Sequence, residues 1–470
     1  MTNVHYLHHA KKTPKRRHEY SYYRVSPGKL ERRAKYDTGK AYALFNIDTS
    51  DYPVLKSAGT GKLLREACLG TVLDFLVSDG MIYILRKYAG ELYLTEFDPA
   101  SKSSVEHSLG SDPGTDPKDY QLVRFNEFSS WGDPLGGKTV KKILVLPGYR
   151  TGEIGTGKST GFETPEAFPS ACVGTEYNSR IFCACNGKIF ASDFNDATSY
   201  NFDTALDQSD SNAWMSNTQS NSKADGEITA LAVYDGHVVI FKRDYMMQVH
   251  NNKNPFRIVE IGSWGCVSKR SLCEFDGKLA FVSPEGVMLY AGGYPYKIGD
   301  ELGVSSWEGA CLCARGKLLY VHVPSELTVY VYDAERDCWG NRDIRGLSFM
   351  GADHSGAYYV LGNAVYAFDE GTPGQFSIET DRNSLGYDGK KRICGICIEA
   401  LIGDGGELCA TMLDQDYNQT DIVHIDVPGE HFINKRINGA GVNYFQLELT
   451  GSGEVSIGGI TVKYKREDDA

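Results

Sequence analysis

The sequence has no run of 18 or more consecutive apolar residues, the length at which a membrane-spanning helix is indicated. Near its N-terminus it also lacks an apolar segment of the kind that directs secretion. Twelve cysteines in a chain of 470 residues without such a segment fit a reducing compartment. We therefore expect a soluble protein that is made in a cytosol and does not insert into membranes.

Positive charge is scarce except at one end of the chain. The formal net charge is −12. Residues 1–40 nevertheless hold eleven lysines and arginines against three acidic side chains, a balance of +8, so the remaining 430 residues carry a balance of −20. Such asymmetry often marks an interaction tail, although a solvated basic terminus has the same composition. We interpret residues 1–40 as a basic N-terminal arm attached to an acidic body.

Glycine, in contrast, is abundant, with 51 residues, and seven of them recur along the chain. Successive members are 57, 50, 49, 41, 39 and 40 residues apart, and most stand in a short polar turn before a β-rich run. Asn-Gly and Asp-Gly are the strongest short-range hairpin signals. A hairpin recurring every forty-odd residues is typical of a β-propeller, whose repeat is a four-stranded blade. The seven are Gly80, Gly137, Gly187, Gly236, Gly277, Gly316 and Gly356.

The clearest predicted blade spans 226–249, where three short strands alternate with tight turns, and the pattern repeats over 271–290 and 309–332. Two loops rich in Gly, Pro, Ser and Thr, at 112–118 and 148–168, interrupt the series. Long loops in a compact domain are usually functional or mobile, so we expect these to project from one face as a contact surface. We predict six or seven blades.

The repeat stops at the Gly-containing stretch 370–374. Beyond it, alternating or apolar runs separated by Gly-rich turns predict a separate, small β-sandwich. The predicted organisation is all-β, with the basic arm at 1–40, a six- or seven-bladed β-propeller at 41–374 and a C-terminal β-sandwich domain at 375–470. The strands expected in the last domain are 392–401, 407–413, 421–427, 444–449 and 460–464.

Residues 152–159 (GEIGTGKS) match the P-loop pattern letter for letter. In a P-loop the Lys and Ser open a helix whose N-terminal amides hold phosphate. Gly161, Pro165 and Pro169 follow closely and prevent a long helix, and no βαβ pattern surrounds the motif. We therefore interpret 152–159 as a flexible glycine-rich loop.

Two other motifs resemble metal sites only in part. Cys394 and Cys397 have redox or zinc spacing, but positions three apart on a strand point to opposite faces, and neither a second pair nor two histidines at finger spacing follow. The nearest further cysteine is Cys409. Residues 414–418 begin like a calcium loop, yet the turn glycine and the bidentate glutamate are missing.

The remaining polar groups point to no specific chemistry. The aspartates within 193–210 favour a solvated loop over a weak cation site. The histidines of the arm, His5, His8, His9 and His18, favour a pH-dependent addition to its charge over chelation. No Ser-His-Asp arrangement can be assigned, and no sialidase Asp-box is present. We predict no catalytic residues, no metal site and no cofactor.

Three stretches carry a resemblance to a known group of proteins. Residues 271–290 (SLCEFDGKLAFVSPEGVMLY) and 187–200 (GKIFASDFNDATSY) look like blades of tailed-phage virion propellers. Residues 321–334 (VHVPSELTVYVYDA), followed by Trp339, are similar to the matching stretch of the packaged-DNA stabilisation proteins of short-tailed phages. Those proteins have nearly this length and also end in a separate β-domain. The resemblance covers most of residues 41–464, but not the basic arm.

The resemblance implies a structural virion protein and not an enzyme. It implies a homo-hexameric ring in the neck or tail of a tailed bacteriophage, a head-to-tail connector below the portal and adaptor that stabilises packaged DNA and forms part of the ejection channel. The related tail-nozzle proteins use propellers in the same way. The implied partners are further copies of the chain, portal, adaptor and tail proteins, and double-stranded DNA that passes the lumen without sequence-specific binding. The implied location is the virion, after assembly in the host bacterial cytoplasm. An acidic body suits a channel wall because it repels DNA phosphates.

Two alternatives belong to other functional classes. The first is a receptor- or glycan-binding propeller of the phage tail tip, or a lectin-like cellular module, which exposed tryptophans would support because sugars stack on aromatic rings. The second is an enzyme that uses the 152–159 loop. Most of the tryptophans are instead expected to pack between blades, where they would offer no platform for a sugar. They are Trp131, Trp214, Trp264, Trp307 and Trp339.

Overall fold

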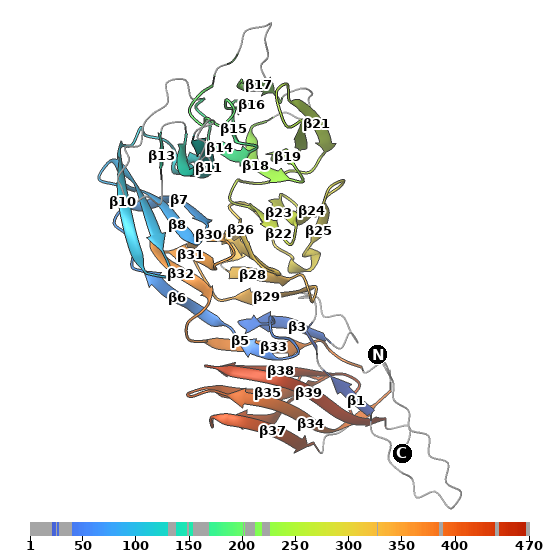
Figure 1. Ribbon diagram of the computed structural model, residues 1–470. Coiled ribbons are helices and arrows are strands. Elements are labelled where there is room, and N and C mark those ends of the chain that lie inside the picture. The colour runs from blue at the N-terminus through green and yellow to red at the C-terminus, as the bar shows by residue number, and fades with distance from the viewer. Residues whose placement is uncertain are drawn as a thin grey trace, which may run out of the picture.

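The computed structural model describes residues 21–24, 26–27, 40–129, 138–147, 150–153, 169–200, 202, 212–218, 226–326, 328–384, 389–437 and 441–466. Its regular structure is almost entirely β-strand, as the sequence predicts (Figure 1). Short 3-10 turns occur at Pro117–Asp119, Asp300–Leu302 and Pro324–Glu326. Within these ranges, no helix has the length and apolarity needed to cross a membrane.

Among the described residues, seven groups of antiparallel strands succeed one another along the chain; one of them, β26 to β29, continues through a parallel bridge between Asn341 and Phe45 into a sheet of the second unit described below. The first three contain β7 (Thr71–Ser78), β8 (Met81–Tyr88), β9 (Glu91–Asp98) and β10 (Ser103–Ser111); β11 (Gln121–Ser129), β12 (Lys138–Leu146) and β13 (Arg150–Glu153); and β14 (Val173–Tyr177), β15 (Arg180–Cys185), β16 (Lys188–Ala191) and β17 (Trp214–Asn217). The next two contain β18 (Ile228–Tyr234), β19 (His237–Lys242), β20 (Met246–His250) and β21 (Arg257–Gly262); and β22 (Leu272–Phe275), β23 (Lys278–Ser283), β24 (Gly286–Tyr290) and β25 (Tyr296–Ile298). The last two contain β26 (Cys311–Arg315), β27 (Leu318–Val323), β28 (Thr328–Asp333) and β29 (Cys338–Arg342); and β30 (Leu347–Ala352), β31 (Ala357–Leu361), β32 (Ala364–Asp369) and β6 (Gly59–Arg65).

These sheets form a closed ring. Their first strands contact one another in chain order, β7, β11, β14, β18, β22, β26 and β30, and β30 contacts β7 again. Each pair of neighbouring sheets also encloses its own cluster of buried apolar side chains, so the core is divided among the contacts between sheets. The predicted β-propeller is therefore the fold of this region (Figure 1).

The ring is closed by a strand from the N-terminal side. Strand β6 pairs antiparallel with β32, so the last sheet takes one strand that precedes all the others in the chain. Gly59 opens β6 so close to the neighbouring backbone that a Cβ built on it would lie 2.4 Å from the Glu370 carbonyl oxygen. A residue without a side chain is therefore required where the two ends of the ring meet.

The tight turns follow the sequence prediction closely. In the Asp79-Gly80, Asn186-Gly187, Asp235-Gly236 and Asp276-Gly277 turns, both residues have positive φ. Two successive positive φ angles define the type I′ turn, whose twist matches that of a two-stranded hairpin. Gly356 departs from this pattern, since it has no positive φ, and Gly137 lies outside the described residues.

A second unit, here called the β-domain, is built from both ends of the chain (Figure 1). One of its sheets contains β37 (Gly429–Arg436), β34 (Lys391–Ile402), β39 (Val455–Arg466), β5 (Leu55–Ser57) and β4 (Ile47–Asp48), with β1 (Ser21–Arg24) beside β39. The other contains β3 (Lys40–Phe45), β33 (Gln375–Thr380), β38 (Phe445–Ser452), β35 (Glu407–Asp414) and β36 (Gln419–Ile425), with β2 (Ser26–Pro27) beside β3. A single cluster of buried apolar side chains draws on both sheets.

The β-domain differs from the sequence prediction at its N-terminal side. Strands β4 and β5, and all of β3 after Lys40, lie within 41–374, the range predicted for the propeller, yet they pair with strands of the β-domain. Strand β37 lies between two predicted strands and was not expected. Whether these segments form strands, and in which sheet, depends on partners far away in the chain, and the local hydrophobic pattern does not reveal those partners.

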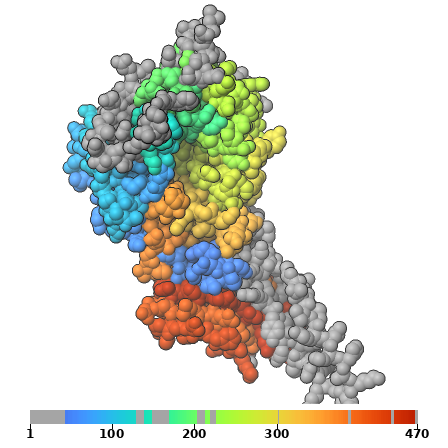
Figure 2. Space-filling view, in the orientation of Figure 1, coloured from blue at the N-terminus to red at the C-terminus, as the bar shows by residue number. Residues whose placement is uncertain are grey.

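Buried polar contacts fix the β-domain to the propeller. Asn46 donates from its backbone N–H to the Asn341 carbonyl over 2.9 Å, and its side-chain oxygen accepts from Asp343 N–H over 2.9 Å. Buried Arg342 donates to the Ile47 carbonyl over 3.0 Å and pairs with Asp369 over 2.6 Å. In the space-filling view, the blue N-terminal strands lie between the propeller and the red β-domain (Figure 2).

Replacing Gly59 with Ala tests the closure of the ring. The added methyl group would meet backbone atoms that cannot move away freely, so we expect the free energy of unfolding to fall by about 1–3 kcal/mol. Gly458→Ala is the matched control, because the nearest atom to a Cβ added there is the Cβ of Glu399, 3.6 Å away. Urea unfolding of both variants measures the difference. Equal stability of the two variants would contradict the steric requirement at the closure.

Candidate functional site

The segment that joins β21 to β22 carries two cations toward other sheets of the propeller. Lys269 Nζ donates to the carbonyl oxygens of Asp119 and Cys172 over 2.9 and 2.7 Å. Arg270 donates through its guanidinium to the Leu73 carbonyl over 2.7 Å. These carbonyls lie at or just before β11, β14 and β7, so one linker is bonded to three other sheets.

Arg270 also contacts the two sheets that complete this set. Its guanidinium carbon lies 4.3 Å from the centre of the Phe349 ring on β30, and its carbonyl oxygen accepts from Leu312 N–H on β26 over 2.9 Å. Such cation–π contacts are stronger when the cation is shielded from water. Lys269 and Arg270 therefore connect the linker before β22 to five other sheets. These are the sheets that begin with β7, β11, β14, β26 and β30.

Asp74 supplies the opposing charge. Its Oδ2 accepts from Leu122 N–H on β11 over 2.7 Å, and its Oδ1 lies 3.7 Å from Arg270 Nε. Burial raises the pKa of Asp74, while Arg270 and Lys269 act in the opposite direction. Burial likewise lowers the pKa of Lys269 to about 8, and Asp74 opposes that shift. The three charges thus partly compensate one another away from bulk water.

A cavity of about 170 Å³ adjoins these side chains. Its polar lining includes Asp74, Gln121, Lys269 and Arg270, and its apolar lining includes Phe349 and Met350. This volume is below the roughly 300 Å³ at which small-molecule pockets usually begin. The hydrogen bonds of Lys269 and Arg270 go mainly to main-chain carbonyls, so the arrangement is suited to bracing the ring.

The P-loop-like stretch lies partly in a strand. Gly152 pairs with Ile143 in the antiparallel ladder of β12 and β13. Glu153 ends β13, while 154–159 lie outside the described residues. The beginning of the motif is thus part of a sheet and not of a loop between a strand and a helix.

The other acidic candidates form turns. Asp414 Oδ1 accepts from the backbone N–H groups of Asp416 and Asn418 over 2.8 and 2.9 Å, which closes the turn between β35 and β36. Hydrogen bonding by Asn418 lowers the pKa of Asp414. Asp193 accepts from Ala213 N–H, and Asp196 Oδ1 accepts from Thr198 N–H over 2.8 Å. Residues 203–210 and the four arm histidines lie outside the described residues.

Most tryptophans for which the structure gives a position pack between sheets. Trp307 and Trp339 are buried in the cluster between the β22 and β26 sheets. Trp214 lies against Phe256 with ring centres 5.3 Å apart. Trp264 is half-buried and pairs with exposed Tyr294 at 5.2 Å, and Trp131 lies outside the described residues. Trp214, Trp307 and Trp339 therefore pack between blades, as expected, and Trp264 also packs against the cluster between the β18 and β22 sheets.

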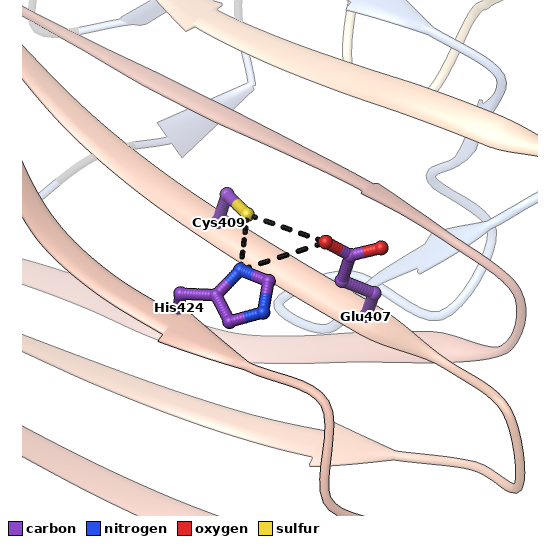
Figure 3. Close-up of side chains that lie close together, drawn as sticks. All are labelled: Glu407, Cys409 and His424. Carbon is purple, nitrogen blue, oxygen red and sulfur yellow. Dashed lines mark hydrogen bonds and ion pairs between the residues drawn. The ribbon is translucent and has the colours of Figure 1, made fainter.

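Sequence reasoning missed one group of side chains in the β-domain. In the described part of the chain, Glu407, Cys409 and His424 form a group of potential ligands whose donor atoms lie within 4.8 Å of one another (Figure 3). The pKa of the Cys409 thiol is raised, mainly by burial and further by the Glu407 carboxylate. A raised pKa disfavours a free thiolate nucleophile at neutral pH. The signal in the sequence was a Glu-x-Cys pair on one strand face followed by a histidine on the next strand. By contrast, Cys394 and Cys397 are half-buried on β34 and belong to no such group.

No family model matches this chain, and no curated protein matches it. Among solved structures, it is similar to the WD40 domain of coronin from Toxoplasma gondii, with 10% identity and a TM-score of 0.41 over 72% of this chain and 88% of that one. It is also similar to apo AztD from Citrobacter koseri, with 12% identity and a TM-score of 0.32 over 62% and 81% of the two chains. A glutaminyl cyclase from Myxococcus xanthus matches with 12% identity and a TM-score of 0.23 over 42% and 88%. Similarities this low carry no argument about activity or ligands.

Replacing Lys269 with Met tests the brace. The carbonyls of Asp119 and Cys172 would lose their donor, so we expect a loss of about 1–3 kcal/mol in the free energy of unfolding near neutral pH. Between the folded pKa of about 8 and the ordinary value of 10.5, the unfolded chain binds more protons at this lysine. As the pH rises through that interval, Lys269 therefore increases the free energy of unfolding of the wild-type protein. The variant has no titrating group at this position and lacks the increase.

Urea unfolding at about pH 7 and about pH 10 measures both effects, and the deficit of the variant should be larger at the higher pH. Lys317→Met is the matched control, because Lys317 is exposed and pairs with Asp276 on the surface. We expect it to change stability by less than about 1 kcal/mol. A pH-independent deficit for Lys269→Met, or an equal one for Lys317→Met, would show that the buried lysine does not act as described.

Proposed function

We propose that this protein is a structural virion component of a tailed bacteriophage. In this proposal it forms a hexameric ring in the neck or tail, below the portal and adaptor, that stabilises packaged DNA and forms part of the ejection channel. The seven sheets are the blades of a seven-bladed propeller, and the β-domain is a β-sandwich. Its role is assembly and not catalysis.

The observation that carries the proposal is the joining of a braced propeller to a β-domain that receives both ends of the chain. This agrees with the domain order implied by the resemblance to packaged-DNA stabilisation proteins, a propeller followed by a separate β-domain. The stretches that carry the resemblance include β22 to β24, β16, β27 and β28, which are blade strands. The resemblance thus rests on residues that build the scaffold.

An exposed sheet edge offers a surface for the next copy in the ring. Among the strands that the structure describes, β37 ends its sheet and pairs with β34 alone, at the end of the molecule far from the propeller (Figure 1). Phe432 on β37 is 69% exposed, and Leu401 on β34 is 50% exposed. Glu399 lies opposite Phe432, so Leu401, two residues on, shares its face. Cyclic rings need two different surfaces that fit each other, and an unpaired edge with apolar side chains suits one of them.

The charge distribution supports the same proposal. Strand β1 pairs with β39 of the β-domain, so the lysines and arginines of residues 1–19 precede a strand anchored there. The body of the chain has a balance of −20, which favours passage of DNA along it without adhesion. The basic arm would then contact an acidic neighbouring subunit or the end of the DNA.

One observation favours the alternative, a receptor- or glycan-binding propeller of the tail tip. Trp264, which is half-buried against the cluster between the β18 and β22 sheets, pairs with Tyr294, and Tyr294 is 73% exposed. Sugars stack on such rings, although a single pair is a small platform.

The oligomeric state separates the two functions. We expect the purified protein to form sixfold rings in negative-stain microscopy and to bind a portal–adaptor complex. Phe432→Asp, which places a charge at the β37 edge, should reduce ring formation by at least tenfold at a fixed concentration, which corresponds to about 1.4 kcal/mol. Leu69→Asp is the matched control, because Leu69 is 67% exposed on the propeller. A monomer that binds glycan arrays would contradict the ring and favour the alternative.

Deleting residues 1–19 tests the basic arm. This deletion removes Lys11, Lys12, Lys15, Arg16 and Arg17 and retains β1 and β2. We expect unchanged unfolding of the propeller but weaker docking of the ring or poorer genome retention in assembled particles. A control in which the three lysines become arginines keeps the charge and should behave as wild type. Complete packaging and normal assembly of the deletion variant would contradict a role for the arm.

A further inference from the structure

The pairing of β35 with β36 places three potential ligands on one face of a sheet. Cys409 and His424 are direct partners in this ladder, and Glu407 precedes Cys409 by two residues, so it points to the same side. The alternate residues Leu408, Ala410 and Ile425 are buried in the β-domain core. Because the core fixes both strands, the three side chains are held near one another by the fold and not by their own hydrogen bonds.

The distances among the ligand atoms are close to those of a metal site. Cys409 Sγ lies 3.0 Å from His424 Nδ1 and 3.7 Å from Glu407 Oε1, and His424 Nδ1 lies 3.5 Å from Glu407 Oε1 (Figure 3). Zinc bonds of about 2.3 Å to sulfur and about 2.0–2.2 Å to nitrogen or oxygen place tetrahedral ligands roughly 3.3–3.6 Å apart. The sulfur–nitrogen distance needs to lengthen by roughly half an ångström, and the other two fit already.

The types of ligand narrow the choice of metal. A thiolate and an imidazole prefer zinc and similar transition metals, whereas magnesium and calcium prefer sites made of oxygen atoms. Asp421 pairs with Thr411, two residues after Cys409, so a further carboxylate stands on the same face of the sheet and adds negative potential near the group. This potential favours a divalent cation over an anion or a neutral ligand.

We propose that Glu407, Cys409 and His424 bind one zinc ion per chain, with water as the fourth ligand. Cys409 binds through Sγ after loss of its proton, His424 through Nδ1 and Glu407 through Oε1. The side chains of His424 and Glu407 are 57% and 44% exposed, so solvent reaches the fourth position. The site lies on β35 and β36 of the β-domain, whereas Lys269 and Arg270 belong to the propeller. The zinc proposal is independent of the function proposed above.

The same three residues also resemble a hydrogen-bonded nucleophile and base, with Cys409 beside His424. That arrangement predicts a reactive thiol without metal, whereas a zinc site predicts a thiol that metal protects. The two chemistries therefore give opposite results when zinc is added.

The test uses the full-length protein, treated with a chelator and then titrated with zinc chloride alone in a calorimeter. We expect one zinc per chain, and Cys409→Ser or His424→Ala should weaken binding by more than about 100-fold, since removing even an outer hydrogen-bond partner of a zinc ligand costs 10–100-fold. Cobalt titration should produce a thiolate-to-metal charge-transfer absorption that Cys409→Ser abolishes. Cys394→Ser is the matched control, because Cys394 is a half-buried cysteine on β34 outside the group.

Alkylation provides a second measurement that does not depend on a variant. With the wild-type protein, zinc should slow the reaction of Cys409 with iodoacetamide, as located by peptide mass mapping, and leave that of Cys394 unchanged. Urea unfolding of the metal-free variants identifies any that fail to fold. The proposal is overturned if zinc does not bind at one ion per chain, or if Cys394→Ser weakens zinc binding as much as Cys409→Ser does. It is also overturned if Cys409 reacts with iodoacetamide equally fast with and without zinc.

Discussion

The pairing of β6 with β32 is the contact on which the rest of the structure depends. A ring of sheets has as many contacts between sheets as it has sheets, but only while its first and last members meet. Strand β6 supplies that meeting, and the chain on its N-terminal side runs directly into β5 and β4 of the β-domain. Closing the propeller therefore also sets where the β-domain lies, and Asn46 and Arg342 secure the junction with hydrogen bonds between the two units.

The meeting of the seven first strands, β7, β11, β14, β18, β22, β26 and β30, creates a second requirement. Inner strands that converge leave carbonyl groups facing a narrow space, and buried polar groups need partners. Lys269 and Arg270 supply donors to three such carbonyls, and Asp74 offsets their charge. Removing one partner of a buried set is costly because the others are left uncompensated. These three side chains therefore contribute to the stability of the ring itself.

Local features of this fold could be predicted from the sequence, and long-range ones could not. The Asp235-Gly236 and Asp276-Gly277 turns were predictable because backbone sterics at two adjacent residues decide them. Strands β3, β5 and β6 were not, since each has a partner some 300 to 400 residues away in the chain. Lys269 likewise looks like an ordinary linker lysine until the ring brings Asp119 and Cys172 to it. Cys409 and His424 are only 15 residues apart, yet their meeting depends on the hairpin register, which a bulge after Ala410 shifts.

The two surfaces of the β-domain that carry proposals belong to different sheets. Strand β37, with exposed Phe432, ends the sheet that contains β34 and β39, whereas the zinc ligands stand on β35 and β36 of the other sheet. The shared apolar core separates the two sheets, and each proposed surface faces away from it. A change at one surface should therefore leave the other intact, since substitutions without shared contacts have nearly additive effects. Zinc binding by a chain whose rings are lost through Phe432→Asp would show that the metal site is a property of the single subunit and not of the assembly.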